Sequence, residues 1–291
     1  MLSFAPIFYR DVFEDRGGPI ASVHLSQLPI FGQNQCQANA FLSAGLITGK
    51  PHQMVFGNAD GTGSSTDPAV AKHIAISEAL ERWAFFETQR ESETKFGFDH
   101  DRSSNGMAAY PGFSRQAKRR ARFEALERFA LVGWWDRRFR ATVMKAPYPD
   151  VGLVRIHHGV EFGEVVVLYH RSLSGSVAYG HAAGRNLATA TSRAAIELVR
   201  AEYVIARHRA RGGLAEVTDP FERRWLYYTG PEGYADFLDH AYASPEKSAP
   251  KWKTIFDGPI PGPWSKWAVV WRHCVEMPTY AFLDSRANFF G

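Results

Sequence analysis

The pentapeptide EALER occurs twice in this chain, in ISEALERWAFFE at residues 76–87 and in RFEALERFALVG at residues 122–133. Side chains three or four positions apart lie on one face of a helix. Each copy therefore predicts a helix that presents two carboxylates together, Glu78 with Glu81 and Glu124 with Glu127. Taken alone, one copy is typical of a solvated helix face, because the pentapeptide consists of good helix formers.

The residues around the repeat favour burial instead. In the first helix Ile76, Leu80 and Trp83 cover the side opposite the carboxylates, and the helix is apolar nearly all round, which is the pattern of a buried helix. Buried carboxylates are costly unless they are paired or bound to cations. Magnesium takes carboxylate and phosphate oxygens as ligands. The repeated glutamates thus predict a site for a magnesium-bound nucleotide.

Polar loops precede both of these helices. A helix from Pro68 to about Gln89, capped by Thr66 or Asp67, follows the loop GNADGTGSSTDP at residues 57–68. Backbone N–H groups in glycine-rich loops and at helix N-termini suit phosphates. The loop lacks the Gly-Lys-Ser/Thr end of a Walker loop, so it predicts a phosphate contact of another kind.

The second helix is expected from Ser114 or Arg115 to about Val132, where Gly133 ends it, after a loop at residues 99–114. A third helix is expected at residues 187–210, with Gly212 and Gly213 after it. Its Arg193 and Glu197 form an i,i+4 pair, which by itself indicates a surface ion pair worth under about 1 kcal/mol.

Strand-type patterns separate the second and third helices. They lie in RATVMKAP, VGLVRIHH, EVVVLYHRS and GSVAYGHAAG, between residues 140 and 184. MVFG at residues 54–57 has the pattern of a strand end. A short helix at residues 231–244 and a strand within KWAVVWRHC at residues 266–274 are expected near the end. This order of helices and strands predicts an α+β fold.

Composition and charge narrow the class of protein. The chain has 291 residues, 45% of them apolar, and a net charge of +4, which permits an acidic ligand without indicating nucleic acid. Two cysteines give no disulfide framework. Neither a signal-peptide pattern nor an apolar stretch of about 20 residues is present. We expect a cytoplasmic protein that binds neither nucleic acid nor membrane.

Three segments resemble the YcaO family in order and approximate spacing. The first is GNADGTGSS followed by AISEALERW, the second runs from SSNGMAAY to EALERFALVGWW, and the third is GHAAGRNLATATSRAAIELV. In the family, each corresponding segment leads into a helix with glutamates at matching positions. The resemblance covers about residues 57–202.

The resemblance implies a YcaO-like fold of β-sheets packed with long helices carrying paired glutamates. It implies one domain over residues 1–291, with the motifs in residues 57–202 and a C-terminal α/β extension at 214–291. By matched position, the implied magnesium ligands are Glu78, Glu81, Glu124, Glu127 and Glu197. The implied ATP-binding residues are Ser64, Arg82, Asn105, Arg128 and Arg193.

The implied activity is ATP- and magnesium-dependent activation of a backbone amide in a ribosomal peptide or protein, which gives an azoline, a thioamide or an amidine. The implied partners are the peptide or protein substrate, an E1-like or sulfur-delivery protein, and a second copy of the chain. Catalysis would rest on positioning and on neutralising phosphate charge.

The chain also departs from the family pattern. Ile74 stands where the family usually has Ser, Thr62 where it often has Lys, and Arg200-Ala201-Glu202 where it usually has Gln-x-Arg. The chain ends in SRANFFG rather than in a proline-rich tail. These departures favour a second hypothesis, a non-catalytic YcaO-like subunit that recognises a peptide or partner. A two-metal phosphohydrolase using the same glutamates is a third.

Other candidate sites have ordinary structural explanations. Cys36 is either a nucleophile or an inert half-buried thiol. The histidines at 157, 158, 170 and 181 are either a metal or acid–base cluster or separate packing residues. The tryptophans at 134–135 and 264–267 are either an exposed binding surface or core.

Overall fold

The computed structural model describes residues 4–48, 50, 53–89, 92–97, 103–211 and 217–279. The chain divides into two compact units. Unit 1 comprises Met1–Pro51, Asn58–Ala125 and Thr254–Val275, and unit 2 comprises His52–Gly57, Leu126–Lys253 and Glu276–Gly291. Each unit is therefore assembled from three separate stretches of the chain. The boundary at Ala125 falls inside a helix, α4 (Ser114–Trp135).

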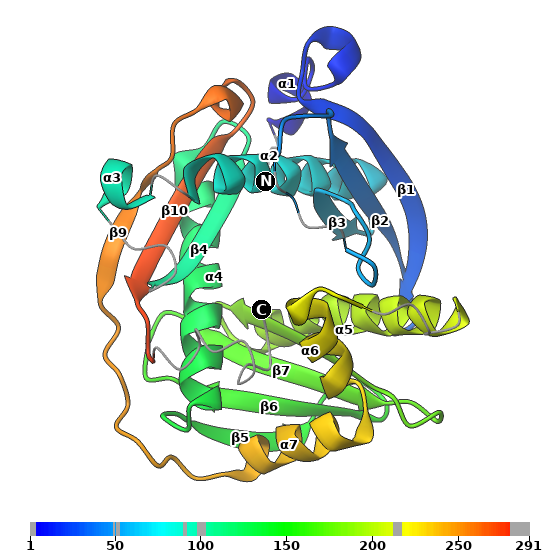
Figure 1. Ribbon diagram of the computed structural model, residues 1–291, viewed down its shortest axis with the longest axis vertical. Helices are drawn as coiled ribbons and strands as arrows, with labels where there is room; N and C mark the ends of the chain where they lie inside the picture. The colour runs from blue at the N-terminus through cyan, green and yellow to red at the C-terminus, as the bar shows by residue number, and fades with distance from the viewer. Residues whose placement is uncertain are drawn as a thin grey trace. The chain divides into compact units, whose positions relative to one another are not determined.

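Unit 1 contains two three-stranded sheets, with strand orders β1-β2-β3 and β4-β10-β9 (Figure 1). The strands are β1 (Ile20–Ile30), β2 (Gln33–Leu42), β3 (Gly61–Ser65), β4 (Ser103–Tyr110), β9 (Thr254–Pro259) and β10 (Val269–Glu276). The helices are α1 (Ala5–Phe8), α2 (Pro68–Gln89), α3 (Ser92–Phe96) and the first half of α4, with two 3₁₀ turns, η1 (Glu14–Arg16) and η2 (Pro263–Lys266).

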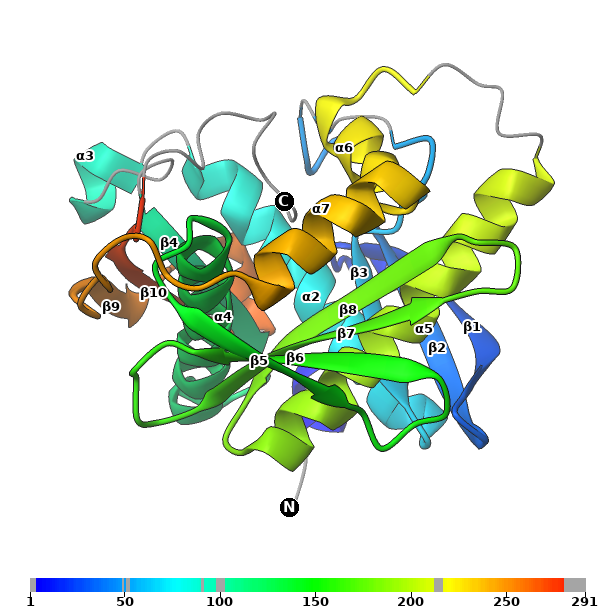
Figure 2. The ribbon, with the colours of Figure 1, turned by 90° about the horizontal axis from the view of Figure 1, so that it is seen from below.

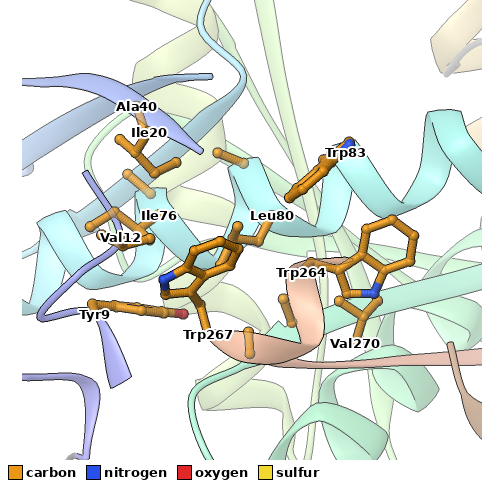
Figure 3. Close-up of a cluster of buried hydrophobic side chains, with 14 of the residues drawn as sticks. Tyr9, Val12, Ile20, Ala40, Ile76, Leu80, Trp83, Trp264, Trp267 and Val270 are labelled. Carbon is orange, nitrogen blue, oxygen red and sulfur yellow. The ribbon is translucent and has the colours of Figure 1, made fainter. Parts of the chain in front are cut away.

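Helix α2 supplies much of the core of unit 1 (Figure 3). Ile76 and Leu80 are at most 1% exposed, and burying one such side chain stabilises a fold by about 1.5–3 kcal/mol. The ring of Trp83 meets that of Trp264 edge to face, with centroids 5.5 Å apart. The buried indole Nε1–H of Trp267 donates to the carbonyl oxygen of Asp11 at 3.1 Å, so its polar atom is satisfied.

Unit 2 is built on one antiparallel sheet in the order β5-β6-β7-β8 (Figure 2). Its strands are β5 (Arg140–Lys145), β6 (Val151–His157), β7 (Glu164–Arg171) and β8 (Val177–Gly184). Its helices are the second half of α4, α5 (Leu187–Ala210), α6 (Pro220–Tyr228) and α7 (Pro231–Tyr242). Helix α5 packs on β8 through Gly180. Phe237 of α7 contacts the Tyr179 ring, on the other face of β8.

The three long helices confirm the sequence pattern. Asp67 accepts a hydrogen bond from the Ala69 N–H at 2.8 Å, so it caps α2 as predicted. The third helix has the predicted bounds, and Asn186 caps it through the Thr189 N–H at 2.9 Å. Gly133 does not end α4, which continues to Trp135. A Cβ at Gly133 would lie 2.2 Å from the ring of Phe139, so this position serves packing rather than termination.

The predicted glycine-rich loops are wrong in part, because their glycine-containing stretches form strands. GTGSS is strand β3, paired with β2 so that Ala38 lies opposite Gly63. SSNGMAAY is strand β4. The phosphate-binding loop inferred from the glycines is therefore replaced by extended backbone.

Two further expectations are corrected. MVFG at residues 54–57 is not a strand end. The β1–β2 hairpin was not anticipated, because its turn is Phe31-Gly32 rather than the common Asn-Gly. Both turn residues have positive φ, 45° and 82°, as a two-residue type I′ turn requires. The predicted glycine stop at Gly212 and Gly213 and the SRANFFG tail lie outside the described residues.

Candidate functional site

One local arrangement of strand and helix occurs three times. A glycine on β3, β4 or β8 lies directly against the backbone of the long helix that follows it. A Cβ at Gly61 would stand 2.1 Å from the carbonyl oxygen of Ala75, and one at Gly106 would stand 1.8 Å from that of Ala121. A Cβ at Gly180 would stand 2.2 Å from the Ala194 oxygen. These glycines are required by close approach of two backbones.

A glutamate occupies the same place in each copy. The helix residues whose backbone N lies near the three glycines are Ala79, Ala125 and Leu198. The residue before each of these is a glutamate, namely Glu78, Glu124 and Glu197. Three residues further on stand Glu81, Glu127 and Arg200. The first two copies thus carry two carboxylates, and the third carries one carboxylate and one guanidinium.

The glutamates of the first two copies hold the edges of sheets. Among the described strands, β3, β4 and β8 each end their sheet, and an edge strand presents unpaired N–H groups. Glu78 accepts from the N–H of Thr62 at 3.1 Å, and Glu124 accepts from the N–H of Met107 at 3.0 Å. One oxygen of each carboxylate is accordingly fixed by backbone, which sets the side chain in one orientation.

The carboxylates of unit 1 repel one another. Burial raises the pKa of Glu81 well above its usual range, and the charges of Glu124 and Glu78 raise it further. Arg82 and the Ala109 N–H oppose the rise without reversing it. Arg82 lies 3.7 Å from Glu78. Carboxylate oxygens are hard ligands of the kind that a divalent cation such as Mg²⁺ prefers.

The carboxylates of unit 2 already have donors beside them. Glu127 accepts from the Nδ1–H of His181 at 2.7 Å and from the Ala183 N–H at 2.8 Å, one on each oxygen. Burial lowers the pKa of His181, but the hydrogen bond and charge of Glu127 outweigh burial, so the pKa is raised overall. Glu197 is paired with Arg200 at 2.8 Å. These two carboxylates do not fit a metal ion as they stand.

The predicted nucleotide contacts are spread over several elements. Ser64 lies on β3 opposite Gln37, and Arg82 donates to the Ala59 carbonyl at 3.5 Å. Asn105 is buried, and its Oδ1 accepts from the Sγ–H of Cys274 at 2.7 Å. The exposed Arg193 donates to the Ala183 carbonyl at 2.9 Å. Arg128 is exposed on α4 in unit 2.

The histidines do not form a cluster. His157 contacts Thr142, His170 contacts Glu202, and His181 contacts Glu127. Within the described residues, no group of three or more His, Cys, Asp or Glu side chains is gathered closely enough to hold a metal ion. Glu78 and Glu124 lie near enough to Glu81 to raise its pKa, but the three carboxylates do not form a coordination shell.

The tryptophans and Cys36 belong to the interior. Trp134, Trp135, Trp264 and Trp267 are all buried, so an exposed aromatic binding surface at these positions is ruled out. Cys36 is buried on β2 and accepts from the Gln27 Nε2–H at 3.3 Å. This environment is that of a structural thiol rather than an activated one.

Glu222, on α6 in unit 2, was missed from the sequence. It is fully buried and accepts three backbone N–H groups, from Met54 at 2.9 Å, Val55 at 2.8 Å and Phe56 at 3.1 Å. The Asp219-Pro220 start of α6 signals a helix cap, but no local pattern indicates a partner so far away in the chain. The carboxylate fastens the MVFG stretch to α6.

Comparison with known proteins supports the fold. No protein-family model matches the sequence, and no curated protein is significantly similar to it. Among solved structures, YcaO from Methanopyrus kandleri bound with AMPPCP and Mg²⁺ is similar, with a TM-score of 0.55 and 13% identity over 98% of this chain and 92% of that one. The fold is therefore YcaO-like. Among the described helices, none is long and apolar enough to cross a membrane.

Proposed function

We propose that this chain binds ATP with Mg²⁺ and uses it to activate a backbone amide of a peptide or protein. The observation that carries the proposal is the grouping of Glu78, Glu81 and Glu124, in which burial, and then the charges of Glu124 and Glu78, raise the pKa of Glu81. Carboxylates arranged this way are costly without a cation. The YcaO-like fold adds support, because the similar solved structure holds AMPPCP and Mg²⁺.

The unit 1 glutamates would hold the cation, and the backbone would hold the glutamates. The N–H groups of Thr62 and Met107 occupy one oxygen each of Glu78 and Glu124. A carboxylate oxygen has two lone pairs, so an oxygen that accepts one hydrogen bond can also ligate a cation. Bound Mg²⁺ supplies charge neutralisation for the phosphates.

The proposed reaction has two steps, phosphorylation of the amide oxygen and replacement of the phosphate by a nucleophile. The amide oxygen of the substrate takes the γ-phosphoryl group of ATP, and ADP leaves. A nucleophile then adds to the amide carbon, and phosphate departs with the former amide oxygen. The identity of the nucleophile decides between an azoline, a thioamide and an amidine. An E1-like or sulfur-delivery partner would supply the substrate or the sulfur in this scheme.

Calorimetric titration with AMPPCP, with and without Mg²⁺, tests the nucleotide site. We expect Mg²⁺-dependent binding by wild type that falls at least tenfold in Glu81→Gln. Glu87→Gln is the matched control, because Glu87 is exposed on the same helix. Circular dichroism verifies that each variant is folded. Absence of binding by wild type, or an unaffected Glu81→Gln, would exclude the proposed site.

A second function is favoured by a specific observation. The glutamates close the edges of β3, β4 and β8, so they have a structural role that needs no nucleotide. A non-catalytic subunit that recognises a peptide or partner would retain them for that reason. Wild type that is folded, binds no AMPPCP and loses stability when Glu124 is replaced would support this function over the enzyme.

A further inference from the structure

Strand β1 forms the edge of its sheet without a charged side chain. Among the described strands that end a sheet, β3, β4 and β8 each donate an N–H to a glutamate. Strand β5 carries Arg140 and Lys145, and β9 carries Asp257. The 11 residues of β1 include no Asp, Glu, Lys or Arg (Figure 1). A long uncharged edge is the kind to which another strand adds.

The register of β1 shows which of its backbone groups face outwards. Val23 lies opposite Ala40 of β2, and the carbonyl oxygen of Ala40 accepts from the Asp60 N–H at 2.8 Å, on the β3 side of β2. Two residues opposite each other in an antiparallel pair turn their N–H and C=O groups either toward each other or both away. Those of Val23 therefore face the outer edge. Alternate residues of a strand behave alike, so Leu25 and Gln27 do the same.

Two interruptions bound this outward-facing stretch. At one end the register with β2 shifts between Ile20 and Ser22, so Ala21 is the extra residue of a bulge. At the other end Pro29 has no N–H to donate. Ala21 lies four positions before Leu25, and Pro29 lies four positions after it. The free edge is therefore symmetric about Leu25, whose side chain is 52% exposed.

We propose that β1 pairs antiparallel with β1 of a second copy of this chain, about a two-fold axis at Leu25. Leu25 then lies opposite the same residue of the second copy, and Val23 lies opposite Gln27 on either side of it. Each of these pairs exchanges both of its N–H···O=C hydrogen bonds, because their backbone groups face outwards. The two sheets join into one, through an interface that is the same on both chains.

The symmetry of the edge favours a second copy over an unrelated strand. The bulge at Ala21 meets Pro29 of the other chain, so neither interruption falls within the paired stretch. The two Leu25 side chains meet at the centre and remove apolar surface from water. No like charges face each other, because the strand has no charged residue. A hollow of about 640 Å³, lined in part by Phe13, Ala21 and Lys72, adjoins the bulge and leaves space for the end of the other strand.

Sedimentation equilibrium of the full chain, without nucleotide, tests the interface. We expect a wild-type dimer whose dissociation constant rises at least tenfold in Leu25→Lys and in Leu25→Glu, because like charges would then lie opposite each other. An equimolar mixture of the two variants should restore the dimer, because opposite charges then face each other. Leu173→Lys is the matched control, because Leu173 is exposed in unit 2, and its dissociation constant should change less than threefold. Circular dichroism verifies that each variant is folded.

The other outcomes overturn the proposal. A wild-type chain that stays monomeric throughout the micromolar range does not pair through β1. A dimer that persists in folded Leu25→Lys is held by another surface. Single variants that stay monomeric when mixed would show that Leu25 does not face its own copy. If neither charged variant folds, Gln27→Pro serves in their place, because proline removes an outward N–H and leaves the ladder to β2 intact; a Gln27→Pro dimer as tight as wild type would overturn the proposal equally.

Discussion

Replacing Gly106 by alanine should destabilise unit 1 severely. The new Cβ would stand 1.8 Å from the Ala121 carbonyl oxygen and 2.4 Å from the Ala125 nitrogen, whereas side chains essentially never approach closer than 3.0 Å. The atoms in the way belong to helix backbone, so no rotamer change relieves the clash. Strand β4 and helix α4 must separate by more than about 1 Å, which costs about 3 kcal/mol or more at the upper end of overpacking effects.

The separation would also weaken the site. Met107 follows Gly106, and its N–H lies 3.0 Å from Glu124. A hydrogen bond to a charged group contributes about 1.5–3 kcal/mol, so part of that stabilisation is lost as the strand moves. Any alanine preference over glycine in extended backbone returns only about 0.5–1 kcal/mol. The net effect therefore stays strongly destabilising.

Urea denaturation followed by far-UV circular dichroism measures the effect. Gly258→Ala is the matched control in the same unit, because the nearest atom to its new Cβ belongs to the movable Phe256 ring, 3.0 Å away. The control should lose less than about 1 kcal/mol. If Gly106→Ala and Gly258→Ala lose equal amounts, the close approach of β4 to α4 does not exist as described.

Three other perturbations have definite expected outcomes. Glu222→Gln should lower the free energy of unfolding by about 2–4 kcal/mol, because at least one of the three backbone N–H groups that Glu222 accepts would then face an amide N–H₂. The control Glu232→Gln, at an exposed position on α7, should leave the free energy of unfolding unchanged in the same urea assay. Burial lowers the pKa of His158 to about 4, so the unfolded state takes up a proton first as the pH falls. The stabilisation that neutral His158 gives the fold is complete above pH 6.5, the pKa of the unfolded state, and is lost as the pH falls towards 4. Between these pH values the wild type should lose about 3 kcal/mol more of its free energy of unfolding than His158→Gln does. Equal losses in the two proteins would contradict this prediction. Glu81→Gln should raise the melting temperature of the metal-free protein at pH 7, because burial and the charges of Glu124 and Glu78 raise the carboxyl pKa and a raised carboxyl pKa stabilises the fold only at low pH. A lower melting temperature in the variant would contradict this reasoning.

Helices were the part of the fold that sequence reasoning predicted best. The good helix formers of EALER indicate α2 and α4, and Asp67 and Pro68 mark the start of α2 by local chemistry alone. Strands β3 and β4 were assigned to loops because glycine and serine normally signal turns. Here Gly61 and Gly106 are present because a helix backbone lies against them, and that reason is tertiary.

The helix positions of the glutamates could be predicted from the sequence, but their hydrogen-bond partners could not. Spacing on a helix places Glu78 with Glu81, and it equally predicts a pair at Glu124 and Glu127. The hydrogen bond from His181 to Glu127 joins β8 to α4 across 54 positions of sequence, so no periodicity reveals it. The clamp of Glu222 on Val55 spans 167 positions and is hidden for the same reason.

The interleaved make-up of the units has a consequence for biosynthesis. Strand β4 borders β10, and β10 in turn pairs with β9, so unit 1 needs Thr254–Val275 to be complete. Roughly 160 residues separate the end of β4 from the start of β10, and a ribosome adding about 5–20 residues each second needs about 8–32 s to supply them. During that interval β4 lacks its partner strand β10. Its unpaired edge is then open to a holdase chaperone. Unit 1 therefore completes its fold only after β10 has emerged from the ribosome.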